Sequence, residues 1–81
     1  MSKLKVLSGV DIINILAKFD FIIAGQKGSH VKLEKIVKGN EKQTLTIPKH
    51  KELDKGTLKA IYNQITRYIQ ENELREYFYT K

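Results

Sequence analysis

The sequence predicts an α+β domain in which one helix, three antiparallel strands and further helix follow one another. Three observations predict this order. Apolar residues recur at helical spacing before residue 20, two segments between residues 30 and 47 alternate in polarity, and a second helical stripe starts near residue 58. A chain of 81 residues with 41% hydrophobic residues can bury one small core, so we expect a single domain over residues 1–81.

The first predicted helix begins after Ser8 and runs to about Phe19. Ser8 and Asp11 have the spacing of a capping box, in which each side chain accepts a hydrogen bond from the backbone N–H of the other residue. Helical spacing then assigns the buried side to Val10, Ile12, Ile13, Leu16 and Phe19.

Three segments rich in β-branched, aromatic or alternating residues predict the strands. They are Phe21–Ala24, His30–Ile36 and Gln43–Ile47. Glycine-containing segments before residue 30 and at residues 38–40 predict tight connections, so the strands pair antiparallel. Pro48 ends the third strand because proline has no N–H to donate to a ladder.

The register of the second and third strands follows from their apolar sides. Val31 opposite Ile47 keeps apolar residues on one face, whereas a slip of one residue would mix the faces. This register sets His30 opposite Pro48, and we therefore expect His50 and His30 to meet at one edge of the sheet. The opposite face, left to solvent or a partner, carries His30, Lys32, Thr44 and Thr46.

A second helix is expected to be capped by Asp54 and to reach about Gln70. Asn72 is then expected to cap a short extra C-terminal helix. We expect the two main helices to cover the apolar face of the single sheet. The stripe of the second helix consists of Leu58, Ile61, Tyr62, Ile65 and Ile69, and the third helix carries Leu74, Tyr77 and Phe78. The four tyrosines, Tyr62, Tyr68, Tyr77 and Tyr79, are expected to pack rather than to form a base-stacking platform on the sheet.

Composition and charge narrow the class of function. Lys and Arg number 15 against 9 Asp and Glu, which gives a net charge of +6 and suits a polyanionic partner such as nucleic acid. The sequence has no Cys, which excludes a disulfide scaffold, a thiolate nucleophile and Cys metal ligands. It also lacks a signal peptide or a membrane-spanning apolar run, so we expect a cytoplasmic protein with no membrane partner.

His30 is the candidate catalytic residue. Histidine exchanges protons near neutral pH, and RNA cleavage requires proton removal from the 2′-hydroxyl and proton delivery to the departing 5′-oxygen. Gly28 and Ser29 before it leave the backbone uncrowded for a phosphate. The alternative is that His30 is an ordinary surface residue. His50 is a second proton carrier, a phosphate contact or a structural loop residue.

Lysines near the second helix are candidates for binding backbone phosphates together with the N–H groups of the helix start. The alternative is a solvated charged loop. Two histidines without convergent Asp or Cys supply too few ligands for zinc, so we expect no metal and no cofactor. The candidate supporting or RNA-binding residues are Lys27, Gly28, Ser29, Lys32, Lys49, His50, Lys51, Lys55 and Lys59.

The spaced landmarks resemble the HicA family of small toxins from bacterial and archaeal toxin–antitoxin pairs, also known as YcfA-like proteins. The resemblance implies a fold like the double-stranded-RNA-binding domain, with order α-β-β-β-α. The landmarks are Gly28, Ser29 and His30, then Thr46, Ile47, Pro48 and His50, then Leu53, Gly56, Thr57, Leu58 and Ile61.

The resemblance also implies an activity and partners. It implies a ribosome-independent endoribonuclease, an mRNA interferase that cleaves mRNA, arrests translation and is neutralised by a HicB-type antitoxin. The family's catalytic histidine corresponds to His30. The segment beyond about Gln70 is longer than is usual for the family and serves either antitoxin contact or extra core.

Two functions of other classes also remain compatible with the sequence. A non-catalytic RNA-binding module would use the same fold and lysines but leave RNA uncut. A protein-interaction domain would show no salt-sensitive affinity for RNA.

Overall fold

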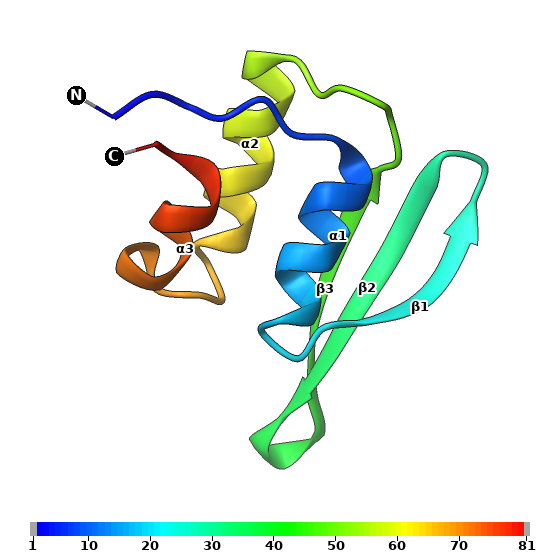
Figure 1. Cartoon of the computed structure of the whole chain (residues 1–81). Helices are drawn as coiled ribbons and strands as arrows, with labels where there is room; N and C mark the ends of the chain where they lie inside the picture. The colour runs from blue at the N-terminus through cyan, green and yellow to red at the C-terminus, as the bar shows by residue number, and fades with distance from the viewer. Residues whose placement is uncertain (1, 81) are drawn as a thin grey trace.

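The computed structural model describes residues 2–80 and has the predicted α+β architecture (Figure 1). A helix is followed by a three-stranded antiparallel sheet of order β1-β2-β3 and then by two helices. None of the helices in the described part of the chain is long and apolar enough to cross a membrane. The elements are α1 (Gly9–Ala17), β1 (Ile22–Lys27), β2 (His30–Val37), β3 (Glu41–Pro48), α2 (Lys55–Ile65) and α3 (Glu71–Phe78).

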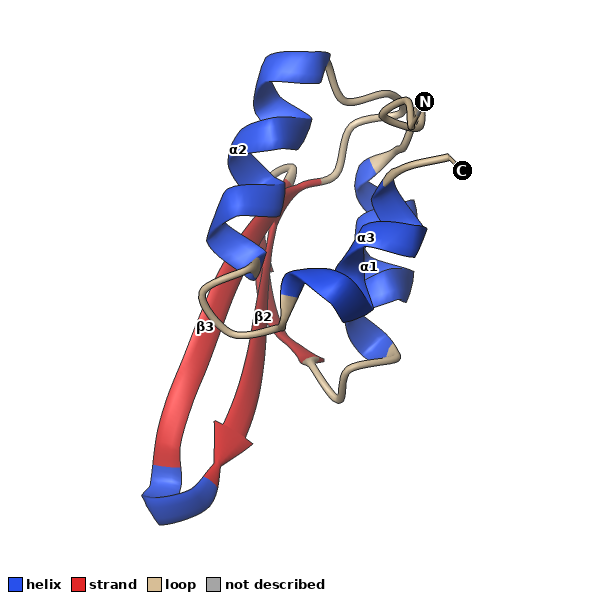
Figure 2. Ribbon diagram, turned by 90° about the vertical axis from the view of Figure 1, so that its left-hand side faces the viewer, coloured by secondary structure: helices blue, strands red, loops and turns tan. Residues whose placement is uncertain are grey.

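The pairing of β2 with β3 has the predicted register. Val31 lies opposite Ile47 and His30 lies opposite Pro48. A short 3₁₀ turn at Lys38–Asn40 joins the two strands. The resulting hairpin extends beyond all three helices, which pack against the end of the sheet that carries His30 (Figure 2).

The capping box predicted for α1 is present. The Asp11 N–H donates to Ser8 Oγ at 3.0 Å, and the Ser8 N–H donates to the Asp11 carboxylate at 2.9 Å. The buried face was wrong at one position, because Val10 is 44% exposed. Val10 precedes the fully buried Ile12 by two residues, which places the two side chains about 160° apart around the helix axis. Ile15 lies on the same side of the helix as Ile12 and is buried in place of Val10.

The bounds and burial of β1 differ from the prediction. The strand runs to Lys27 rather than to Ala24, because a register shift between Ile23 and Gly25 lets pairing continue past the irregular position. The helices cover β2 and β3 and leave β1 open. Ile23, which is paired with the buried Leu33 on the helix-covered face, is 59% exposed. The expectation that the helices cover the apolar face of the sheet therefore holds for two of the three strands.

The second helix is shorter than predicted. Asp54 caps it as expected, since the Asp54 carboxylate accepts from the Thr57 N–H at 2.7 Å. The helix ends at Ile65, and shortly after it the N–H groups of Arg67 and Tyr68 bond three residues back, which tightens the chain into a turn. Ile69 is still buried, but it lies beyond the helix. The predicted cap at Asn72 was wrong, because α3 has already begun there.

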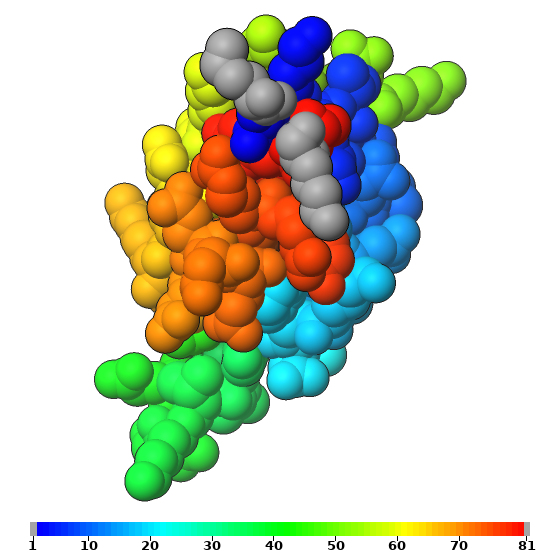
Figure 3. All heavy atoms as spheres, turned by 60° about the vertical axis from the view of Figure 1, so that its left-hand side comes forward, coloured from blue at the N-terminus to red at the C-terminus, as the bar shows by residue number. Residues whose placement is uncertain are grey.

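The C-terminal segment forms part of the core. Leu74 and Phe78 of α3 are fully buried. Leu4 and Tyr79 form an antiparallel bridge, and the Lys5 N–H donates to the Phe78 carbonyl at 2.7 Å. Figure 3 shows α3, in orange and red, packed beside the blue N-terminal segment. The tail therefore supplies extra core, which is one of the two roles that the sequence left open.

Tyr62 and Tyr77 pack on helices as predicted, whereas Tyr68 lies in the turn after α2 and Tyr79 lies in the bridge with Leu4. Tyr62 is 5% exposed, and its ring meets the rings of Phe78 and Tyr79 edge-on at centroid distances of 5.0 and 5.5 Å. The Tyr77 ring likewise meets Phe19 at 5.8 Å. None of the four tyrosines lies on a strand, so the sheet presents no tyrosine platform to a base.

Candidate functional site

A two-residue hairpin turn positions His30. Lys27 and His30 are paired across β1 and β2, which leaves Gly28 and Ser29 as the loop. Gly28 has a φ of +59°, as the first central residue of a type II′ turn requires, and such turns match the twist of the flanking strands. The Gln26 side-chain amide donates to the Gly28 carbonyl at 3.0 Å and supports the turn.

His30 lies on the open face of the sheet with cationic neighbours. Its side chain is exposed between its pairing partners Lys27 on β1 and Pro48 on β3. Lys32 follows on the same face, and its Nζ is 3.5 Å from the Glu34 carboxylate, which offsets part of its charge. Within residues 2–80 the His30 ring has no hydrogen-bond or ion-pair partner. Both ring nitrogens are therefore free to exchange a proton with a ligand.

The chain turns away from the sheet at His50. The Lys49 N–H donates to the Ser29 carbonyl, which extends the β2–β3 pairing by one residue. The His50 carbonyl then accepts a 2.9 Å hydrogen bond from the Gly9 N–H at the start of α1. His50 lines a surface pocket of about 390 Å³ together with Ser8, Val10, Lys49 and Lys51.

The register that was expected to bring the two histidines to one edge of the sheet is confirmed, and the meeting of their side chains stays a prediction. His30 is not among the residues that line the His50 pocket. No hydrogen bond links the two rings in the described part of the chain. The turn after Pro48 directs the His50 backbone toward α1, so the strand register alone does not position its ring.

Gly9 is a structural requirement of this region that the sequence analysis missed. A Cβ atom there would lie 2.7 Å from the Lys49 Cα and still closer to the Pro48 carbonyl oxygen. Glycine therefore allows the start of α1 to approach the β3–α2 loop. The signal in the sequence was a glycine in the first turn of a well-capped helix, where glycine is otherwise unfavourable.

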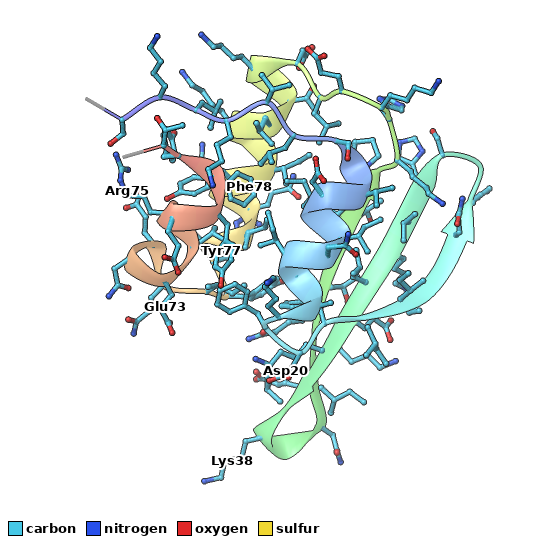
Figure 4. The ribbon with its side chains drawn as sticks, viewed as in Figure 1. Asp20, Lys38, Glu73, Arg75, Tyr77 and Phe78 are labelled. Carbon is cyan, nitrogen blue, oxygen red and sulfur yellow. The ribbon has the colours of Figure 1, made fainter. Side chains whose placement is uncertain are left out.

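The lysines near α2 form two groups rather than one. Lys49 and Lys51 line the His50 pocket, whereas Lys55 and Lys59 line a second pocket of about 400 Å³ beside the chain ends. All four residues are exposed. The β3–α2 loop and the start of α2, which contribute these lysines to the two pockets, lie at the same end of the molecule as the β1–β2 turn (Figure 1). Side chains tipped with nitrogen project from that end in Figure 4.

The Asp54 carboxylate already accepts a hydrogen bond from one of the backbone N–H groups at the N-terminus of α2. Hydrogen bonds from the Thr57 side chain and then from its backbone N–H hold the pKa of Asp54 below its usual value. The carboxylate therefore supplies the negative charge that favours this pole of the helix. A phosphate expected on the N–H groups of this helix start would compete with Asp54 for Thr57, so the exposed ammonium groups are the better candidates for phosphate contacts.

The described residues contain no group of three or more His, Asp or Glu side chains placed to hold a metal ion. The chemistry that the site itself offers is proton transfer by imidazole and charge stabilisation by ammonium groups.

The fold and the site define a small basic α-β-β-β-α domain with an exposed histidine directly after its first hairpin turn. A family model described as HicA toxin of bacterial toxin-antitoxin matches residues 9–66, which is more than half of the chain. The chain belongs to the HicA toxin family. The matched span includes α1, the sheet, the loop lysines and α2, and it excludes α3 and the paired chain ends. No curated protein and no solved structure gives a significant match.

Proposed function

We propose that residues 1–81 act as one toxin domain that is an mRNA interferase, an endoribonuclease that cleaves mRNA in the cytoplasm and arrests translation. The observation that carries the proposal is the position of His30 in a chain of the HicA toxin family. His30 is exposed, follows the Gly28 turn and has no internal partner within residues 2–80. A HicB-type antitoxin is the protein partner that this family membership supports.

His30 transfers a proton at the scissile phosphate in this proposal. Attack of the 2′-hydroxyl on phosphorus releases a proton, and the departing 5′-oxygen takes one up. An exposed imidazole near neutral pH can carry either step. Lys27, which is paired with His30, places an ammonium group where charge accumulates on the phosphate oxygens. The reaction as proposed requires no metal ion.

In this proposal the lysines provide affinity for RNA, and the open face of the sheet lets RNA reach His30. Lys49 and Lys51 lie directly beyond the strand that pairs with His30. Contacts from ammonium groups to phosphates carry no sequence information, so this part of the site binds RNA without selecting a sequence. Gly28 and Ser29 in the turn, Lys32 on the open face and His50 in its pocket are supporting positions.

Replacement of His30 by Ala tests the proposal directly. Purified parent protein incubated with RNA in EDTA is expected to cleave it, and His30→Ala is expected to leave the RNA intact while melting at the parent temperature. Loss of one acid–base group costs about 10²- to 10⁴-fold in rate. Lys42→Ala is the matched control, because Lys42 is exposed on the same sheet face at the far end of the β2–β3 hairpin. Cleavage at the parent rate by His30→Ala would make the catalytic assignment wrong.

The same experiment separates the other readings. A non-catalytic RNA-binding module would bind RNA and leave it uncut in both parent and His30→Ala forms. A protein-interaction domain would show no RNA affinity that falls with salt. The exposed Ile22 and Ile36 add apolar surface on the His30 face, which suits contact with an antitoxin. Copurification of the product of an adjacent antitoxin gene, with inhibition of cleavage, tests that partner.

A further inference from the structure

The pocket beside the chain ends is strongly cationic. It has a volume of about 400 Å³, and its lining contains Lys3, Lys55 and Lys59 but no acidic residue. None of these three lysines forms an ion pair within residues 2–80. Ser2, Leu4 and Tyr79 complete the lining.

The walls of this pocket are held by pairing between the two ends of the chain. The Thr80 N–H donates to the Lys3 carbonyl at 2.7 Å, and the Lys3 N–H donates to Thr80 Oγ1 at 3.0 Å. The Leu4–Tyr79 bridge continues this pairing. The backbone that carries Lys3 is thereby paired with the end of the described chain, and Lys3 lines the same pocket as Lys55 and Lys59 of α2.

The positions of Lys55 and Lys59 are unfavourable for helix stability. They are four residues apart on one face of α2, where like charges repel. They also lie near the positive pole of the helix, which favours anions. An anion in the pocket would relieve both repulsions at once.

We infer that this pocket is a phosphate-binding subsite for RNA on one side of the cleaved bond. The inference rests on the proposed function and extends it to residues that the family match does not include, namely Lys3 and Tyr79. The β1–β2 turn, the β3–α2 loop and the start of α2 lie along one end of the molecule (Figure 1). Lys49 and Lys51 in the loop lie between His30 and the pocket, so an RNA strand that leaves His30 meets ammonium groups along its path.

A comparison of RNA lengths tests the subsite. In a His30→Ala background, binding is measured for RNAs of about four and about sixteen nucleotides, the range that single-strand sites span. The variant Lys3→Ala/Lys59→Ala is expected to bind the longer RNA roughly ten- to thirtyfold more weakly at 0.1 M salt, with a salt slope shallower by about 1.4. Affinity for the short RNA is expected to equal that of the His30→Ala protein with both lysines intact. A short RNA that is bound at residue 30 does not reach the pocket.

The matched control removes the same charge at the opposite end. Lys38→Ala/Lys42→Ala lies on the β2–β3 hairpin, where Figure 4 shows the Lys38 side chain at the tip. This control is expected to lose less than threefold, and melting curves check that all variants fold. Equal losses in both double variants, or an equal loss of binding to polyglutamate of matched charge, would overturn the subsite.

The outcomes also separate this inference from the proposed function. If the parent cleaves RNA and the pocket variant binds the long RNA like the parent, the subsite alone is wrong. If the parent binds neither RNA, both the subsite and the proposed function are wrong.

Discussion

The backbone N–H of Gly9 donates a 2.9 Å hydrogen bond to the carbonyl oxygen of His50. This bond ties the start of α1 to the loop that carries Lys49 and Lys51. A side chain at residue 9 would collide with the backbone of Pro48 and Lys49. The two backbones can therefore come close enough to form this hydrogen bond only because residue 9 is glycine. The geometry of the His50 pocket is therefore set by a glycine that contacts no ligand.

Gly9→Ala is expected to destabilise the protein by about 1–3 kcal/mol, because the added methyl group must displace the Pro48 carbonyl. The gain in helix propensity, about 0.5–1 kcal/mol, is smaller than this cost. Thermal unfolding measures the change. Gly56→Ala is the matched control, since a Cβ there would be 4.0 Å from its nearest neighbour, and it is expected to melt at or above the parent temperature. A Gly9→Ala protein that melts like the parent would contradict the close approach.

Lys51→Glu/Lys55→Glu is expected to weaken RNA binding and to flatten its dependence on salt. Each lost phosphate contact reduces the salt slope by about 0.7 for a single strand. Binding titrations across a salt series give the slope. An unchanged affinity at every salt concentration would place the RNA elsewhere on the protein.

Leu74→Ala in α3 is expected to cost about 2–5 kcal/mol of unfolding free energy, because the side chain is fully buried and its removal leaves a cavity. Asn72→Ala on the same helix is exposed and is expected to change stability by about 0.5 kcal/mol or less. Urea unfolding compares the two variants. A Leu74→Ala protein as stable as the Asn72→Ala protein would show that α3 is not part of the folded core.

Tyr62 links α2 to α3 in a way that predicts a loss of stability at high pH. Burial, followed by the hydrogen bond from its hydroxyl to Glu71 at 3.0 Å, raises the pKa of Tyr62 from 10.0 to about 12. The unfolded chain therefore loses this proton first. The stabilisation is complete below about pH 10 and is lost as the pH rises toward 12.

Tyr62→Phe isolates this effect. The variant is expected to lose about 0.5–1.5 kcal/mol at neutral pH with its hydrogen bond. The difference in unfolding free energy between parent and variant is expected to shrink between pH 10 and 12. Tyr68→Phe is the control, because Tyr68 is 39% exposed and its hydroxyl has no hydrogen bond within residues 2–80. A difference that stays constant over this pH range would contradict the raised pKa.

Local patterns predicted the elements whose signals lie close together in the sequence. The Ser8–Asp11 box, the Asp54 cap and the pairing of Val31 with Ile47 depend on spacing or alternation, and the structure confirms each of them. The position of His30 at the start of β2 followed from the same register. The family resemblance through the spaced motifs is likewise confirmed over residues 9–66.

Contacts between distant segments could not be predicted in this way. Nothing near Leu4 indicates that it pairs with Tyr79, and nothing near Lys55 indicates that Lys3 lines the same pocket. The end of α2 was also missed, because the stripe continues to Ile69 while the backbone has already turned. Apolar periodicity indicates which residues are buried, and here the buried residues continue beyond the end of the helix.

The bridge between Leu4 and Tyr79 also sets an order of events during synthesis. These residues are separated by most of the described chain, so a growing polypeptide can pair them only after residue 79 has been made. Lys3 gains its hydrogen bonds only when Thr80 has been made, two residues after Phe78 joins the core. A nascent chain that has not yet reached residue 80 therefore lacks the Lys3–Thr80 pairing that holds one wall of the cationic pocket.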